Sequence, residues 1–100
     1  IQHGFDCRPD LVAIDNPVDP RKYLGQFWID SITHDIVMLE YVLKMVGSKK
    51  ITLGSDYPFP LGELEPGKLI HSMSFSDKKK AKLLGENAMN WLNIEKHYFL

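Results

Sequence analysis

Residues 27–54, FWIDSITHDIVMLEYVLKMVGSKKITLG, decide the fold of this chain. The aromatic and β-branched residues at 27–29 end in Asp30 and predict a buried strand. Apolar side chains at 38, 41, 42 and 45 follow the spacing of one helical face and predict a helix over 35–46 that ends at Gly47. Further apolar residues around this helix predict that it is covered on more than one side. The run 49–54 predicts a second strand, so about thirty residues form a unit of the size of a right-handed βαβ crossover.

The second strand leads into residues 51–67, ITLGSDYPFPLGELEPG, where a short apolar run meets Asp56 and then a loop stiffened by Pro58 and Pro60. In α/β folds, ligands bind at the edge formed by the carboxyl ends of parallel strands. A carboxylate held there is a candidate metal ligand or general base. The spacing leaves equally open that Asp56 caps the following turn through its side chain. Asp30, at the end of the first strand, is a weaker candidate for lining this edge or orienting a ligand.

The flanking segments are interpreted from prolines, caps and helical spacing. Residues 1–26 contain three prolines and are expected to be mostly loop. Within them, Asp19 before Pro20 predicts a short helix over 20–24. Downstream we expect a helical turn over 68–73 and a helix that begins at Ser76. Gly85 either interrupts that helix or divides it into two short helices.

Composition limits the possible functions. The 100 residues are 44% hydrophobic, which is enough for the core of one domain. The net charge is −1, from 12 Lys and Arg against 13 Asp and Glu, so we expect no binding to nucleic acid or to an anionic membrane. The four lysines at 78–80 and 82 are expected to form a solvated helix face. Cys7 is the single cysteine and is expected to be an inert buried thiol in a reducing compartment such as the cytoplasm.

The chain is expected to be incomplete as a folding unit. An isolated pair of strands is marginally stable, and parallel strands need cover on both faces. The chain also begins at Ile1, without a methionine. We therefore expect residues 1–100 to be one segment of a larger α/β domain, or to be completed by a partner. No apolar run approaches the roughly 20 residues of a membrane span, so the protein is expected to be soluble.

Four segments together resemble one known family. They are HGFDCRPDL (3–11), DNPVDPRKYLG (15–25), TLGSDYPFPLGELEPGKLI (52–70) and GENAMNWLNIE (85–95). They resemble the carboxy-terminal third of the amidohydrolase-type decarboxylases, and specifically the members that act on 2-amino-3-carboxymuconate 6-semialdehyde in tryptophan catabolism by the kynurenine pathway. The string DYPFPLGELEPG is specific to these members, whereas GSDYP points only to the superfamily. The resemblance implies a zinc-dependent, non-oxidative decarboxylase on a (β/α)8 TIM-type barrel, of which this chain is the incomplete carboxy-terminal portion.

The resemblance also implies roles for individual residues. Asp56 occupies the position of the acid that binds Zn²⁺ at the end of the last barrel strand, and a carboxylate oxygen suits that ion. Arg8 matches the arginine that family members donate across a homodimer interface to hold a substrate carboxylate, a task for which a guanidinium fork is suited. Phe59 and Leu61 match positions that line the substrate pocket. Without the resemblance, Arg8 could equally form an exposed ion pair, and Phe59 and Leu61 could be ordinary packing residues of a loop.

No catalytic residue is assigned within the chain, because the acid–base histidine and the other zinc ligands of the family lie upstream of the matching part. His34 is expected to cap the helix or partly enter the core, and His71 and His97 to face solvent. A zinc site needs about three protein ligands, so the chain alone is expected to be inactive. Two alternatives stay open: a non-catalytic interaction fragment that docks on a barrel protomer, and part of a related decarboxylase or hydrolase with another substrate.

Overall fold

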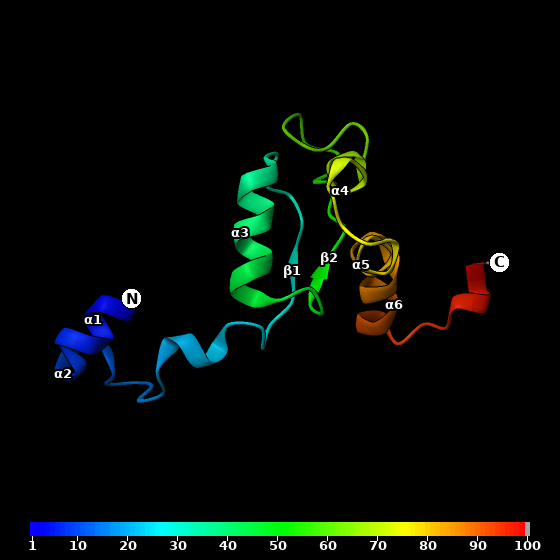
Figure 1. The fold of residues 1–100 in the computed structure, drawn as a ribbon. Helices are drawn as coiled ribbons and strands as arrows, with labels where there is room; N and C mark the ends of the chain where they lie inside the picture. Colours follow the sequence, from blue (N-terminus) through cyan, green and yellow to red (C-terminus); the bar gives the residue numbers. More distant parts are fainter. Residues whose placement is uncertain (100) are drawn as a thin grey trace.

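A two-stranded parallel sheet lies at the centre of the molecule (Figure 1). The computed structural model describes residues 1–99. Strand β1 (Ile29–Asp30) pairs with β2 (Ile51–Thr52), and helix α3 (Ile36–Val46) connects them. The predicted strand–helix–strand unit is therefore confirmed. Both strands are shorter than predicted, because no other strand within residues 1–99 pairs with their outer edges.

Helix α3 matches the predicted range 35–46 and ends at Gly47, as predicted. The Asp35 carboxylate accepts a hydrogen bond from the Met38 N–H at 2.8 Å, and Gly47, at φ 80°, donates its N–H to the Leu43 carbonyl. Leu39 and Leu43 are buried, whereas Val37 and Tyr41 are exposed. The expectation that this helix is covered on more than one side is therefore not met within the described chain.

The second half of the chain is helical after a long loop. Helix α4 (Lys68–Ser72) is followed by α5 (Asp77–Ala81), the π-helical turn η2 (Lys82–Glu86) and α6 (Asn87–Leu92). The Ser76 hydroxyl accepts from the Lys79 N–H at 3.3 Å and so starts α5, as predicted. Gly85 lies inside the π-helical turn, where one extra residue is accommodated without a break between α5 and α6. The short 3-10 helix η3 (Lys96–Phe99) follows.

The amino-terminal segment contains two helices, α1 (Gln2–Cys7) and α2 (Pro9–Val12), so the expectation of a loop there is wrong. The prolines misled the prediction, because Pro9 occupies the first turn of α2, where a missing N–H costs nothing. The predicted short helix is the 3-10 helix η1 (Pro20–Tyr23), and Asp19 accepts from the Arg21 N–H at 2.9 Å. Figure 1 shows that α1 and α2 extend away from the sheet, in a molecule that measures 53 × 29 × 28 Å.

One small core joins α3, β2 and the carboxy-terminal helices. Its buried members are Leu39, Leu43, Ile51, Ile70, Met73 and Leu83. The side chain of Asn87 is also buried, and its amide donates to the carbonyls of Ser48 at 2.7 Å and Ile51 at 2.8 Å. Asn87 thereby ties the start of α6 to the start of β2, which fixes the sheet against the helices.

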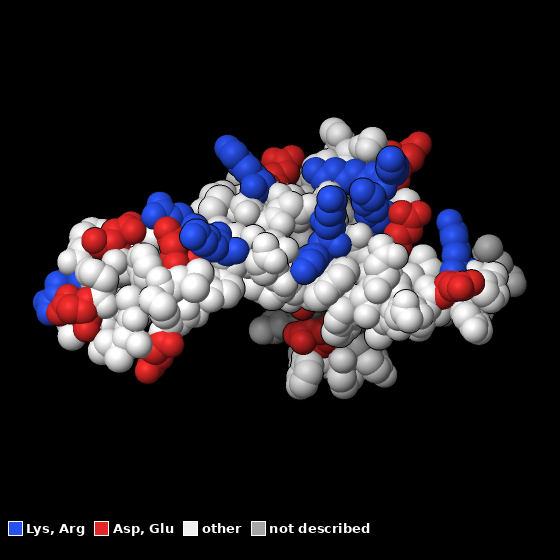
Figure 2. Space-filling view, turned by 90° about the horizontal axis from the view of Figure 1, so that it is seen from below, with Lys and Arg blue, Asp and Glu red and all other residues white. Residues whose placement is uncertain are grey.

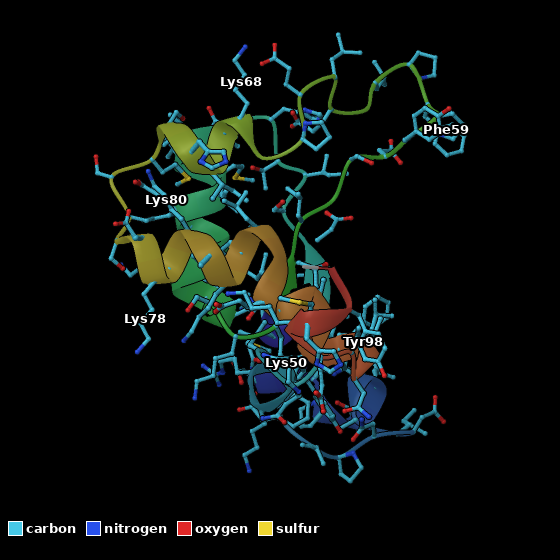
Figure 3. The ribbon with its side chains drawn as sticks, turned by 90° about the vertical axis from the view of Figure 1, so that its right-hand side faces the viewer. Lys50, Phe59, Lys68, Lys78, Lys80 and Tyr98 are labelled. Atoms are coloured by element: carbon cyan, nitrogen blue, oxygen red, sulfur yellow. The ribbon has the colours of Figure 1, made fainter. Side chains whose placement is uncertain are left out.

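The lysine run at 78–82 is only partly a solvated face. Lys80 donates to the His71 carbonyl at 2.7 Å, and the Lys79 ammonium lies 3.8 Å from the centre of the Phe75 ring. Lys78 is exposed and points away from the helices (Figure 3). Figure 2 shows basic side chains over the middle of one face, with acidic side chains beside them. Within the described residues, no helix has the length and apolar character needed to cross a membrane.

Candidate functional site

The loops that follow β1 and β2 meet at one edge of the sheet. The Gly54 N–H donates to the Ser31 hydroxyl at 3.4 Å. A Cβ atom at Gly54 would lie 2.8 Å from the Asp30 Cβ and 2.9 Å from a side-chain carbon of Ile32, so this close approach requires glycine. The carboxyl ends of the two strands are therefore adjacent, as a parallel pair requires, and the loop that carries Asp56 begins beside Asp30.

The Asp56 carboxylate does not cap the turn that follows it. That turn is closed by main-chain atoms, since the Phe59 N–H donates to the Asp56 carbonyl at 2.9 Å. The hydroxyl of Ser55 accepts from the Tyr57 N–H at 3.3 Å. Among residues 1–99, the exposed side chain of Asp56 has no hydrogen-bond partner. Its backbone is left-handed, with φ 55°, a conformation that is uncommon outside glycine and that clusters at functional sites.

The Asp30 side chain, unlike that of Asp56, accepts a hydrogen bond. Its carboxylate accepts from the Ile32 N–H at 3.0 Å, which stabilises the bend that leaves β1. Asp30 remains exposed at the same edge of the sheet. Its hydrogen bond within its own loop gives Asp30 a local structural task, and Asp56 is left as the free carboxylate of the two.

Phe59 and Leu61 lie at the tip of a loop that folds back on itself. The Gly62 N–H donates to the Phe59 carbonyl at 3.0 Å, and the Glu63 N–H donates to the Ser55 carbonyl at 2.7 Å. Phe59 is 64% exposed and Leu61 83% exposed, so they do not pack as ordinary loop residues within this chain. Figure 3 shows Phe59 at the outer end of the loop, away from the helices. The tip thus presents apolar side chains near a free carboxylate.

Arg8 forms the exposed ion pair that its sequence left open. Its guanidinium donates two hydrogen bonds to the Asp10 carboxylate, at 2.9 and 2.7 Å. This contact raises the pKa of Arg8 and lowers the pKa of Asp10 from their ordinary values. Arg8 lies between α1 and α2, and these helices are well separated from the loop at 55–67, which lies at the top of Figure 1 beside α4. The chain therefore brings Asp56, Phe59 and Leu61 into one loop and leaves Arg8 apart from them.

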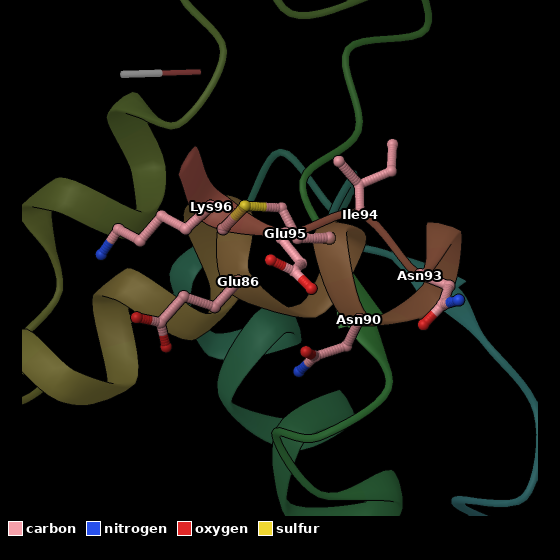
Figure 4. A pocket seen from close by; sticks show the side chains of 7 residues that line it. Glu86, Asn90, Asn93, Ile94, Glu95 and Lys96 are labelled. Atoms are coloured by element: carbon pink, nitrogen blue, oxygen red, sulfur yellow. The ribbon is translucent and has the colours of Figure 1, made fainter. Parts of the chain in front are cut away.

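The described residues do not form a complete metal centre. Within residues 1–99, no three His, Cys, Asp or Glu side chains are grouped so that they could hold an ion. A hollow of about 440 Å³ lies between α6 and the segment after it (Figure 4). Its lining residues are Glu86, Met89, Asn90, Asn93, Ile94, Glu95 and Lys96. None of them belongs to the loop that carries Asp56, so this hollow is separate from the strand-end site.

One contact at the site had no signal in the sequence. The side chains of His34 and Glu63 are in contact, with 3.0 Å between Nδ1 and Oε1, although the two residues are far apart in the chain. The expectation that His34 caps the helix or enters the core is wrong, because Asp35 provides the cap and His34 is exposed. The only pattern that could have suggested the pair is that both residues lie in loops after strands.

The other side-chain expectations have mixed outcomes. His71 and His97 are exposed, as expected. Cys7 is exposed rather than buried, so that expectation is wrong. The reason is that α1 has no buried residue and Cys7 ends this helix on the surface.

Comparison with known proteins assigns the family. A family model described as amidohydrolase matches residues 11–94, and the chain belongs to the amidohydrolase family. The chain is 52% identical over 101 aligned positions to 2-amino-3-carboxymuconate-6-semialdehyde decarboxylase of Dictyostelium discoideum, and the match covers 100% of this chain and 28% of that protein. A protein of the same name from Caenorhabditis elegans is 44% identical over 98 positions, which cover 97% of this chain and 24% of that protein. The predicted resemblance is confirmed, and the chain spans about a quarter of the length of these curated relatives.

Proposed function

We propose that this chain is the carboxy-terminal portion of a zinc-dependent, non-oxidative decarboxylase built on a (β/α)8 barrel. The family and the two similar decarboxylases support this activity, and their name supplies the substrate, 2-amino-3-carboxymuconate 6-semialdehyde from tryptophan catabolism. The parallel strand–helix–strand unit is the repeat from which such barrels are built. The observation that carries the proposal is the free, exposed Asp56 carboxylate at the carboxyl end of β2.

Asp56 supplies one ligand of the zinc site. A carboxylate oxygen is a normal zinc ligand, and Asp56 has no competing hydrogen bond within residues 1–99. The remaining ligands come from parts of the protein outside these residues. Zinc supplies Lewis acidity and makes hydroxide available near neutral pH. The left-handed backbone of Asp56 and the closed loop after it hold the carboxylate at the strand end.

Arg8, Phe59 and Leu61 bind the semialdehyde substrate. Both carboxylate oxygens of Asp10 accept from one edge of the Arg8 guanidinium, Nε and Nη2, in the paired geometry that a substrate carboxylate also uses. Because Arg8 lies far from the Asp56 loop, Arg8 serves the site of the second protomer in a homodimer. Phe59 and Leu61 extend from the loop tip and cover the apolar part of the substrate. Exposed Cys7 suits a reducing compartment, and the protein acts in the cytoplasm.

The test is metal content and turnover of the full-length protein after substitution of Asp56. Asp56→Ala and Asp56→Asn are expected to lose bound zinc and to reduce decarboxylation by more than about 100-fold, because ligand loss exceeds the 10–100-fold effect of residues that only support ligands. Asp15→Ala, at an exposed acid of the amino-terminal segment, is the matched control and should retain both. Retention of zinc and turnover in Asp56→Ala contradicts the ligand assignment.

The apolar surface of the chain favours a second candidate function. Val37, Tyr41 and Trp91 are among many large side chains exposed to solvent. A separate 100-residue product with this surface would dock on a barrel protomer and supply Arg8 in trans without catalysing a reaction. Size-exclusion chromatography with the full-length protein distinguishes the two, since a stable monomer without affinity for the partner excludes docking. A different substrate within the family is the remaining alternative, and a substrate panel on the full-length protein separates it.

A further inference from the structure

The loop between Ser55 and Glu63 is closed where its two ends meet, and we call these two residues with Gly62 the neck of the loop. The Glu63 N–H donates to the Ser55 carbonyl at 2.7 Å, and the two inner hydrogen bonds of the loop lie between these ends. Gly62 is part of the neck, and a Cβ atom there would lie 2.5 Å from the Ser55 carbonyl oxygen. No side chain fits at this position without a backbone shift. The loop therefore behaves as one compact unit. Contacts at its closed end, where Ser55 and Glu63 meet, set its orientation.

Glu63 also connects the neck to the neighbouring loop. Its side chain is 21% exposed and contacts the ring of His34, which is 52% exposed, with 3.0 Å between Oε1 and Nδ1. His34 has a left-handed backbone, with φ 55°, in the loop after β1. One residue thus closes the loop with its main chain and bridges the carboxyl ends of both strands with its side chain.

The nearest charged pair, Lys68 with Glu65, is separate from the contact between His34 and Glu63. His34 and Glu63 share a hollow of about 340 Å³ with Lys68, Leu69 and Ser72. Lys68 forms an ion pair with Glu65, with 2.9 Å between Nζ and Oε1, and both side chains are 69% exposed. Glu63 is three times less exposed than Glu65. The His34–Glu63 contact is therefore the more enclosed of the two and is the one that links separate loops.

We propose that His34 and Glu63 are positioning residues that fix the orientation of the substrate loop at 55–63. This inference rests on the proposed function, because it assigns the contact a role in placing Phe59 and Leu61 against the substrate. The pair does not touch Asp56, so it acts on the loop tip more than on the metal ligand. The loss of either partner removes the side-chain contact at this closure, so the loop opens and changes its orientation more often.

The test compares variants of the full-length protein by kinetics and by hydrogen exchange. His34→Ala and Glu63→Ala are each expected to raise KM for the semialdehyde by about 3- to 10-fold, with kcat within about twofold. The double variant should be no worse than the single variants, because they remove the same contact. Glu63→Gln keeps a side-chain oxygen and the same length of side chain at the contact, and should restore KM to within about twofold of the wild type. The matched control is Lys68→Ala with Glu65→Ala, which removes the neighbouring exposed pair and should leave KM unchanged.

Hydrogen exchange tests the role of His34 and Glu63 without measuring decarboxylation. The amides of Phe59, Gly62 and Glu63 are bonded within the loop and should exchange about 3- to 10-fold faster in both alanine variants. Zinc content should stay at the wild-type value, whereas failure of the proposed function appears as zinc retention in Asp56→Ala. Unchanged KM and unchanged exchange in both alanine variants would overturn the inference. Additive effects in the double variant would overturn it as well.

Discussion

At the scale of single residues, the structure separates side chains that hold the fold from those left free for chemistry. Asp35, Asp19 and Asp30 each accept a hydrogen bond from a nearby backbone N–H. Asp56 accepts none through its side chain among residues 1–99. These acids look alike in the sequence, because aspartate before a turn or helix favours capping in general. Local hydrogen bonding distinguishes Asp56 from the others, and only coordinates show it.

Asn87 is expected to be the most sensitive polar residue of the fold. Asn87→Ala removes two donors from buried carbonyls of Ser48 and Ile51 and should lower the free energy of unfolding by about 2–3 kcal/mol. Asn87→Asp should be worse, because a carboxylate only accepts and would face two carbonyl oxygens. Urea unfolding of the full-length protein measures both. Asn90→Ala, at an exposed amide on the same helix, is the control and should stay within about 0.5 kcal/mol. An equally small effect of Asn87→Ala would show that the hydrogen bonds from Asn87 to Ser48 and Ile51 contribute little to stability.

At the scale of elements, the ends of helices were predictable and the sides that they bury were not. Gly47 and Ser76 were predicted correctly, since a cap depends on neighbours in the sequence, whereas the residue that caps the start of α3 is Asp35 and not the expected His34. The apolar residues of α3 surround the helix, so their spacing does not select the face that packs. Leu39 and Leu43 are buried because they meet the core formed with β2 and the carboxy-terminal helices.

Substitutions on α3 should show this difference between its faces. Leu39 is fully buried, and Leu39→Ala should cost about 2–5 kcal/mol of unfolding free energy through lost burial and a cavity. Val37 is 71% exposed, and Val37→Ala on the opposite face should change stability by less than about 0.5 kcal/mol if this face stays open. Thermal unfolding of the full-length protein compares the two. A large cost for Val37→Ala would place a further packing surface over α3.

At the scale of the whole molecule, the chain buries a small core and exposes many large apolar side chains. The family is shown over residues 11–94, and the curated relatives are about four times longer than the matched segment. Two short strands whose outer edges pair with no other strand within residues 1–99 are marginal by themselves. The surface of the chain therefore fits an element of a larger assembly better than an independent domain.

Dye binding should report this exposed surface. The isolated 100-residue chain is expected to bind the apolar dye ANS and to increase its fluorescence, because many large apolar side chains are open to solvent. The full-length protein should bind far less dye per chain, since most of these side chains pack there against the rest of the protein. Fluorescence titration at equal molar concentration measures the difference. Weak dye binding by the isolated chain, with cooperative unfolding, would mean that it folds as an independent domain.

The sequence by itself determined the strand–helix–strand unit, the caps at Gly47 and Ser76 and the family, because these depend on local periodicity, local hydrogen bonding and shared strings of residues. It does not reveal the amino-terminal helices, because a proline such as Pro9 fits a loop as well as the first turn of a helix, which is where it lies. It also missed the His34–Glu63 contact and the Asn87 tie. Only the tertiary structure decided these, and the freedom of the Asp56 carboxylate, because they join groups that the chain brings together after the elements have packed.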